Sequence, residues 1–158
     1  MSLARILSLA LVFVAVLGFN LACSKADTPV EDGPPIVVAH GDDGTIDVAW
    51  AKNWDDALAR ASSQEQAVLV TFYADWCIWC TRLENTTLTD RDVAGFMAEA
   101  LVPVRLDVEG DGQELSRDFR VNGLPTVLIV DAEGDEISRI EGYLPPGDFL
   151  EWIKGALA

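Results

Sequence analysis

The chain has 158 residues and a formal charge of −15, because 26 Asp and Glu outnumber 11 Lys and Arg. This excess of negative charge argues against a nucleic-acid partner and against electrostatic attachment to anionic lipid. Half of the residues are hydrophobic and five are tryptophan, which is enough apolar material for one compact domain of about 110 residues.

The N-terminus has the pattern of an export signal. After Arg5, residues 6–19 form an almost unbroken apolar stretch, which is shorter than the roughly 20 residues that a membrane-spanning helix needs. A basic start, an apolar core and small residues after it are typical of a secretory signal peptide, and a buried core helix is the alternative. We expect residues 1–22 to be a signal peptide of the lipoprotein type.

Cys23 suggests lipidation. The segment Leu21-Ala22-Cys23-Ser24 resembles the lipobox of bacterial lipoproteins, whose cysteine is acylated and becomes the mature N-terminus, although Asn20 stands where that motif usually has leucine. Cleavage by the ordinary signal peptidase is the alternative. Three cysteines would leave one odd thiol in an oxidising compartment, and acylation of Cys23 would leave only Cys77 and Cys80.

Residues 23–44 are rich in Pro, Gly and Asp, which predicts a flexible tether. His40, the only histidine, falls in this stretch and is expected to be a solvated linker residue. The protein should therefore lie on the periplasmic side of a bacterial membrane, held by a lipid on Cys23. Ser24 after the lipidation site favours the outer membrane, and a soluble periplasmic protein is the alternative.

The folded domain is expected to span residues 45–158. Apolar periodicity and turn residues predict the following elements: a strand at 46–50, a helix capped by Asn53 through 63, a buried strand at 67–73, a helix at 77–85, a helix capped by Thr89 or Asp90 through about 100, a strand at 101–108, a helix at 113–119, a buried strand at 126–130, a hairpin turn at 131–135 into a strand at 136–141, and a helix at 146–157. This order predicts an α/β fold with a mixed central sheet and helices on both faces.

The segment Trp76-Cys77-Ile78-Trp79-Cys80 follows a buried strand and opens a predicted helix. Two thiols separated by two residues can close into a disulfide and reopen. The unpaired N–H groups and partial positive charge of a helix N-terminus favour a thiolate at the first cysteine. The sequence therefore predicts a redox-active cysteine pair.

Together with Gly123-Leu124-Pro125-Thr126 and the terminal hairpin and helix, this segment resembles the thioredoxin superfamily over residues 45–157. Within the superfamily, the motif ending at Cys77, the acid Glu84 and the extra helix near residues 90–100 are most similar to the periplasmic C-terminal thioredoxin domain of the thiol:disulfide interchange protein DsbD and to related thioredoxin-like lipoproteins. The resemblance implies a thioredoxin-like fold.

The resemblance also implies roles for individual residues. Cys77 would be the exposed nucleophile that attacks a substrate disulfide, and Cys80 the resolving thiol. Pro125 would be cis and, with Leu124, would lie beside the docked substrate chain. Trp76 would shape the docking surface or instead fill the core, and Trp79 would offer an apolar contact to a partner.

Two departures from the superfamily pattern concern the chemistry. Ile78 and Trp79 replace the Gly-Pro pair of common thioredoxins, which leaves the redox potential open. Thr71 stands where thioredoxins usually bury an aspartate, and a threonine cannot accept a proton from a thiol at neutral pH. Glu84 and Asp75 are the candidate modulators of proton transfer, and a solvated surface carboxylate is the alternative for Glu84.

These features predict an extracytoplasmic thiol-disulfide oxidoreductase that acts on protein disulfides or dithiols. The chain has no room for the helical insertion common in stand-alone oxidases, which favours the reducing or interchange direction. No cofactor is expected, since no flavin or nicotinamide motif such as GxGxxG is present, so electrons would come from a membrane partner. The alternatives are a copper or zinc chaperone, for which two thiolates are few ligands, and a non-catalytic thioredoxin-like adaptor.

Overall fold

The computed structural model describes residue 46 and residues 48–158. The predicted signal peptide, the predicted lipidation site Cys23 and the predicted tether with His40 lie outside the described residues. Within the described part of the chain, no helix is long and apolar enough to cross a membrane.

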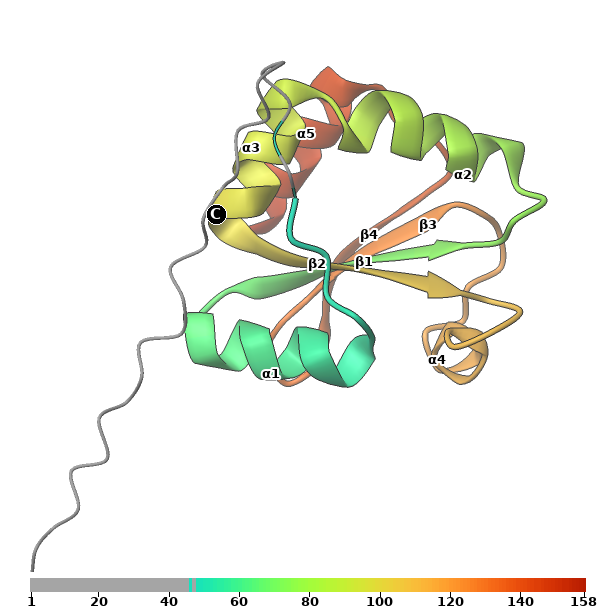
Figure 1. The fold of residues 1–158 in the computed structure, drawn as a ribbon, viewed down its shortest axis with the longest axis horizontal. Helices are drawn as coiled ribbons and strands as arrows, with labels where there is room; N and C mark the ends of the chain where they lie inside the picture. The colour runs from blue at the N-terminus through green and yellow to red at the C-terminus, as the bar shows by residue number, and fades with distance from the viewer. Residues whose placement is uncertain (1–45, 47) are drawn as a thin grey trace, which may run out of the picture. The chain divides into compact units, whose positions relative to one another are not determined.

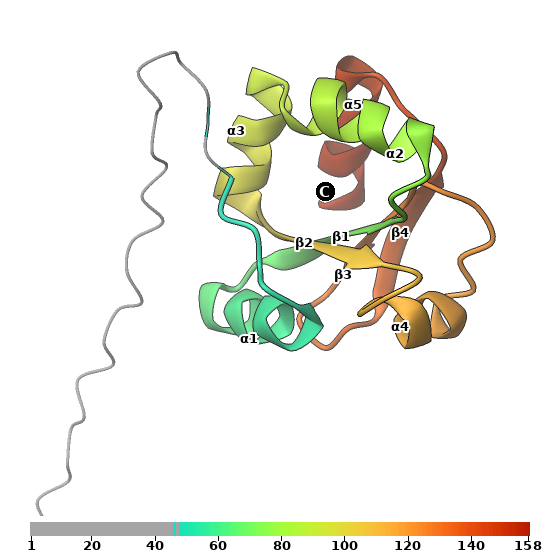
Figure 2. The same ribbon diagram turned by 45° about the vertical axis from the view of Figure 1, so that its right-hand side comes forward.

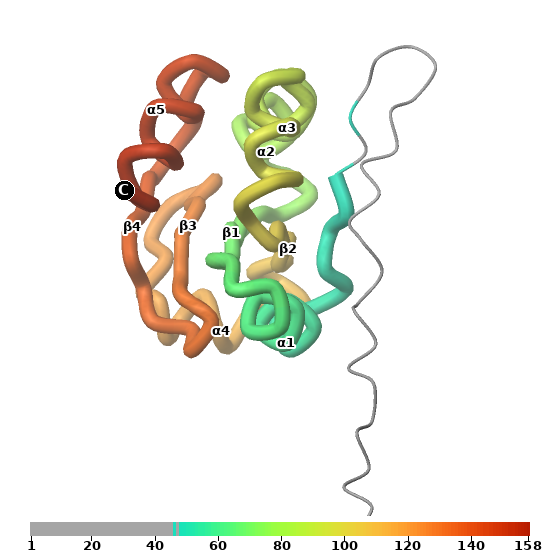
Figure 3. The backbone as a smooth tube through the Cα atoms, turned by 90° about the vertical axis from the view of Figure 1, so that its left-hand side faces the viewer, coloured from blue at the N-terminus to red at the C-terminus, as the bar shows by residue number. Residues whose placement is uncertain are grey.

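A four-stranded mixed sheet forms the centre of the domain (Figure 1). Its strands are β1 (Ala67–Tyr73), β2 (Leu101–Asp107), β3 (Thr126–Val130) and β4 (Glu136–Glu141). They lie in the order β2-β1-β3-β4, with β2 parallel to β1 and the other two neighbouring pairs antiparallel. Figure 3 shows the four strands one after another across the sheet. The α/β prediction with a mixed sheet is confirmed.

Helices cover both faces of the sheet (Figures 1 and 2). One face is covered by α1 (Trp54–Gln64) and α4 (Gln113–Asp118), and the other by α2 (Ile78–Arg82), η1 (Leu83–Leu88), α3 (Arg91–Ala100) and α5 (Pro146–Ala156). The alternation of side chains along a strand explains the division. In β1, Val68 and Val70 join the apolar cluster under α1, whereas Leu69 joins the cluster under α3 and α5.

The strand predicted at residues 46–50 is not formed over its described residues 48–50, and Ile46 lies in an isolated bridge. Another isolated bridge pairs Ala51 with Val104 of β2. The Ala51 N–H donates to the Pro103 carbonyl at 2.7 Å, so the backbone nitrogen of Pro103 faces the same outer edge and offers no N–H to a further strand. The alternating apolar residues serve packing, since Val48 and Trp50 lie against the core.

The helix predicted at residues 77–85 continues beyond its predicted end. The turns of α2 widen at Leu83 into the π-helix η1, which ends at Leu88. Tertiary contacts hold these additional turns: Leu88 is buried, and the Thr87 hydroxyl donates to the Leu144 carbonyl at 2.7 Å. Of the two caps considered for α3, the structure uses Asp90.

Candidate functional site

Cys77 and Cys80 form a disulfide at the start of α2, with their Cα atoms 5.2 Å apart. Cys77 is the N-cap of the helix, and its Sγ accepts a hydrogen bond from the Cys80 N–H at 3.1 Å. The Cys77 N–H donates to the Ala74 carbonyl at 3.0 Å, which closes the turn between β1 and the helix. After reduction, the same helix-end N–H group would stabilise a thiolate on Cys77.

The expectation that Cys77 is exposed is wrong for this disulfide state. Cys77 is 4% exposed and Cys80 is 2% exposed. Because Cys77 caps the helix, its sulfur turns toward the first-turn N–H groups and away from solvent. The flanking side chains occupy the surface instead.

Three exposed apolar side chains flank the buried disulfide in the sequence. Trp76 is 69% exposed, Ile78 is 77% exposed and Trp79 is 50% exposed. The alternative that Trp76 fills the core is therefore wrong. Exposed apolar groups grouped next to a reactive site are a common feature of protein-binding surfaces. We call these three residues the apolar rim.

Trp79 is held by two residues that the sequence analysis missed. Its ring packs against Tyr143 at 6.0 Å between centroids, and the Arg82 guanidinium lies 5.4 Å from the Trp79 ring and 4.8 Å from the Tyr143 ring. The hydrogen bond with Thr86 lowers the pKa of Tyr143, and the nearby Arg82 charge acts in the same direction. The spacing of three residues between Trp79 and Arg82 on one helix could have identified that contact, but the contact with Tyr143 is tertiary.

The peptide bond between Leu124 and Pro125 is cis, as the resemblance implied. The next residue, Thr126, pairs in register with Phe72 near the end of β1. The cis-proline loop therefore enters β3 at the same end of the sheet from which the cysteine segment leaves β1. Leu124 is half-buried and packs against the apolar cluster under α1, so only part of it is available to a partner.

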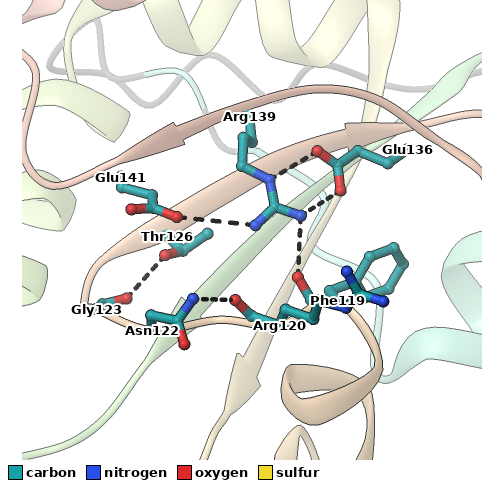
Figure 4. A network of polar contacts seen from close by, with 8 residues as sticks. All are labelled: Phe119, Arg120, Asn122, Gly123, Thr126, Glu136, Arg139 and Glu141. Carbon is teal, nitrogen blue, oxygen red and sulfur yellow. Dashed lines mark hydrogen bonds and ion pairs between the residues drawn. The ribbon is translucent and has the colours of Figure 1, made fainter.

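A polar network connects the C-terminal end of α4 (Gln113–Asp118), where the segment leading to this loop begins, to the edge strand β4 (Figure 4). Arg139 pairs with Glu136 and with Glu141, and it also donates to the Phe119 carbonyl at 2.9 Å. The hydrogen bond with Arg139 holds the pKa of the Glu136 carboxyl below its usual value. Farther along the loop, the Thr126 hydroxyl donates to the Gly123 carbonyl at 2.8 Å.

The candidate acids lie in different surroundings. Glu84, in η1, forms an ion pair with Arg105 of β2, whereas Asp75 is exposed in the turn before Cys77. Neither acid is hydrogen-bonded to a cysteine within the part of the chain that the structure describes. Thr71 is 1% exposed, and its hydroxyl has no hydrogen-bond partner among the described residues.

Comparison with known proteins places this architecture in a family. A family model described as a thioredoxin-like domain matches residues 54–157. The chain is 38% identical over 98 residues to the thiol:disulfide interchange protein DsbD of Actinobacillus pleuropneumoniae serotype 5b (strain L20), an alignment that covers 59% of this chain and 17% of that protein. The chain therefore spans about a sixth of the length of the curated relatives that it matches.

Two solved structures are similar in fold and sequence. A thioredoxin from Thermus thermophilus has a TM-score of 0.64 and 27% identity, covering 70% of this chain and 88% of that one. The reduced form of the DsbD C-terminal domain of Neisseria meningitidis has a TM-score of 0.55 and 26% identity, covering 65% of this chain and 92% of that one. The chain belongs to the family of thioredoxin-like domains, and within it resembles DsbD.

Proposed function

We propose that this chain is a thiol-disulfide oxidoreductase that exchanges disulfides with protein substrates through Cys77 and Cys80. The observation that carries the proposal is the Cys77–Cys80 disulfide. Cys77 caps the helix at the end of the sheet where the cis-Pro125 loop also lies. The similarity to DsbD, whose name states thiol:disulfide interchange, supports the same chemistry.

In the reducing direction, the Cys77 thiolate attacks a substrate disulfide, forms a mixed disulfide and releases one substrate sulfur as a thiolate, which takes a proton. The Cys80 thiol then loses its proton and attacks the Cys77 sulfur. The Cys77–Cys80 bond forms, the bond from Cys77 to the substrate breaks, and the second substrate sulfur leaves as a thiolate that is protonated. The substrate gains two electrons and two protons, and the domain becomes oxidised.

The residues around the disulfide have roles in this proposal. Trp76, Trp79 and the backbone at Leu124 and Pro125 dock the substrate chain. The apolar rim favours a partner that covers it, because burial of apolar surface contributes about 25 cal/mol per Å².

Glu84 and Asp75 are proposed modulators of proton transfer. Glu84 follows Cys80 by one helical turn, so the two residues share a helix face. Asp75 precedes Cys77 by two residues and is open to solvent. We assign neither of them as the base that deprotonates Cys80.

We further propose a reducing or interchange role on the periplasmic side of a bacterial membrane. The apolar stretch at residues 6–19 supports export, and residues 1–22 are proposed as a signal peptide. Lipidation of Cys23, preferentially at the outer membrane, and a tether at residues 23–44 would let the domain at residues 45–158 reach its partners. Electrons would be supplied by a membrane donor.

Trapping of a mixed disulfide tests the proposal. In the native cell envelope, Cys80→Ser should accumulate partners linked to Cys77 by a bond that dithiothreitol cleaves. The matched control is Cys77→Ser/Cys80→Ser, which retains Cys23 and lacks the reactive pair. If the single variant captures no more protein than the control, thiol-disulfide exchange is not its function.

The equilibrium of the pair with glutathione then tests the direction. A reductant should have a potential near the roughly −270 mV of thioredoxin, and a value near the roughly −120 mV of a strong oxidant would contradict the reducing role.

A further inference from the structure

The ion pair between Arg105 and Glu84 connects the sheet to the active-site helix. Arg105 is in register with Thr71 of the neighbouring strand, so the two side chains leave the same face of the sheet. The Arg105 guanidinium also lies 4.4 Å from the Tyr73 ring centroid, which fixes its position beside β1. The pair is partly open to solvent, with the side chains of Arg105 and Glu84 39% and 26% exposed.

The position of Glu84 makes its charge matter to Cys80. In an α-helix, side chains four residues apart are about 5–6 Å apart at Cβ, and Glu84 follows Cys80 by four residues across the junction of α2 with the wider helix η1. Cys80 is buried on the same helix face, where a thiolate would be poorly hydrated. A carboxylate at this distance opposes a second negative charge, unless a cation compensates it.

The other charged or titratable groups near this face do not provide that compensation. On the helix, Arg82 turns toward Trp79 and Tyr143. Burial raises the pKa of Tyr73, although Arg105 opposes the rise, so Tyr73 is neutral at pH 7. The charged groups that also act on Tyr73 are Asp107, Asp111 and Asp75, and all three add negative charge. The side chains that α3 and α5 contribute to the buried cluster on this face are apolar: Val93, Ala94, Met97, Phe149 and Ile153.

We propose that Arg105 is a positioning residue for thiol chemistry: it pairs with Glu84 and thereby removes the electrostatic obstacle to a Cys80 thiolate. The inference rests on the proposed function, since Cys80 must become a thiolate to resolve a mixed disulfide. Among the described residues, Arg105 forms no hydrogen bond or ion pair with either cysteine, and its ion-pair partner is Glu84, so it acts on the thiols through Glu84. Its effect should therefore depend on the presence of Glu84.

The test is a titration of thiolate absorbance in the reduced full-length chain with Cys23→Ser, which leaves two thiols. Arg105→Met should move the second transition, assigned to Cys80, upward by about one pH unit, the size expected for one uncompensated charge at this separation. At a fixed pH below the midpoint, the rate of mixed-disulfide resolution should fall about tenfold. Arg105→Lys should retain most of the wild-type behaviour because it keeps the charge.

Two further variants make the test specific. Glu84→Gln combined with Arg105→Met should return the midpoint to near its wild-type value, because no charge is left to compensate. Arg60→Met is the matched control, since Arg60 also pairs with an acid, Asp56, but does so on α1, across the sheet. If Arg105→Met does not fold, Arg105→Gln serves in its place.

The proposal is overturned if Arg105→Met titrates like Arg60→Met, or if the double variant keeps the shift. The titration needs no substrate, so it tests Arg105 separately from the proposed function. A chain that titrates as expected but captures no partner would refute the proposed function alone.

Discussion

The buried hydroxyl of Thr71 offers a sharp test of the site. Thr71 lies in β1 at 1% exposure with no hydrogen-bond partner among the described residues. A buried hydroxyl without a partner costs about 1–3 kcal/mol in proteins. Valine has almost the same shape and is equally suited to a strand. Thr71→Val should therefore stabilise the oxidised domain by about 1–2 kcal/mol, or raise its melting temperature by about 5–10 °C.

Thermal and urea unfolding of the oxidised protein measure this gain, with Thr126→Val as the matched control. Thr126 is also a buried strand threonine, but its hydroxyl donates to the Gly123 carbonyl at 2.8 Å. The control should lose about 1 kcal/mol. If Thr71→Val is destabilised like the control, the Thr71 hydroxyl has a partner such as an ordered water. Exchange rates should stay within about twofold of wild type; a tenfold loss in the stabilised variant would mean that the hydroxyl takes part in proton transfer.

Three further predictions concern other parts of the domain. Because Arg139 lowers the Glu136 pKa from 4.5, this carboxylate stabilises the fold above that pH, and the contribution is lost as the pH falls through the folded value. Glu136→Gln should cost under about 1 kcal/mol of unfolding free energy at pH 7, and the cost should shrink steadily as the pH is lowered below 4.5, as measured by urea unfolding. An equal loss at every pH would exclude the ion pair as the cause. Gly112→Ala would place a Cβ 2.7 Å from the Leu106 Cβ, and should lower the free energy of unfolding by about 1–3 kcal/mol in the same assay. A variant as stable as the wild type would show that the loop at Gly112 rearranges without cost. Trp76→Ala should change the free energy of unfolding by less than about 0.5 kcal/mol, but it should slow the reduction of protein disulfides several-fold. Glutathione disulfide is the control substrate, and equal slowing of both reactions would argue against docking by Trp76.

The central strands and the positions of the cysteines could be predicted from the sequence, because they depend on local patterns. The runs at residues 67–73 and 126–130 form strands with the predicted bounds, and the turn at residues 131–135 leads into β4 as expected. Apolar alternation at residues 46–50 was a weaker guide, because it describes packing against a core as well as it describes pairing in a sheet. At the outer edge of β2, Pro103 has no N–H to donate to a neighbouring strand. The pattern of residues 46–50 does not reveal this, because Pro103 lies in a distant segment.

The side-chain partners of the site could not be predicted in the same way, because they come from distant segments. Arg105 is 21 residues from Glu84 in the numbering, and Tyr143 is 64 residues from Trp79. Each pairing depends on how the helix lies across the sheet. The burial of Cys77 has a similar origin, since helix capping directs its sulfur inward and leaves Trp76 and Ile78 at the surface.

This combination of a buried disulfide and an exposed apolar rim suggests how partners are selected. A sulfur pair that is almost inaccessible reacts slowly with a reductant that merely collides with the surface. A protein that covers the rim gains binding energy before the sulfur atoms meet. A tryptophan side chain can bury about 150–250 Å², so covering the exposed part of Trp76 alone is worth about 2–4 kcal/mol. That binding energy can offset the cost of moving the side chains that cover the Cys77 sulfur. Selectivity would then come from the rim residues Trp76, Ile78 and Trp79, whereas the intrinsic reactivity of the thiols would come from the helix end and the Arg105–Glu84 pair.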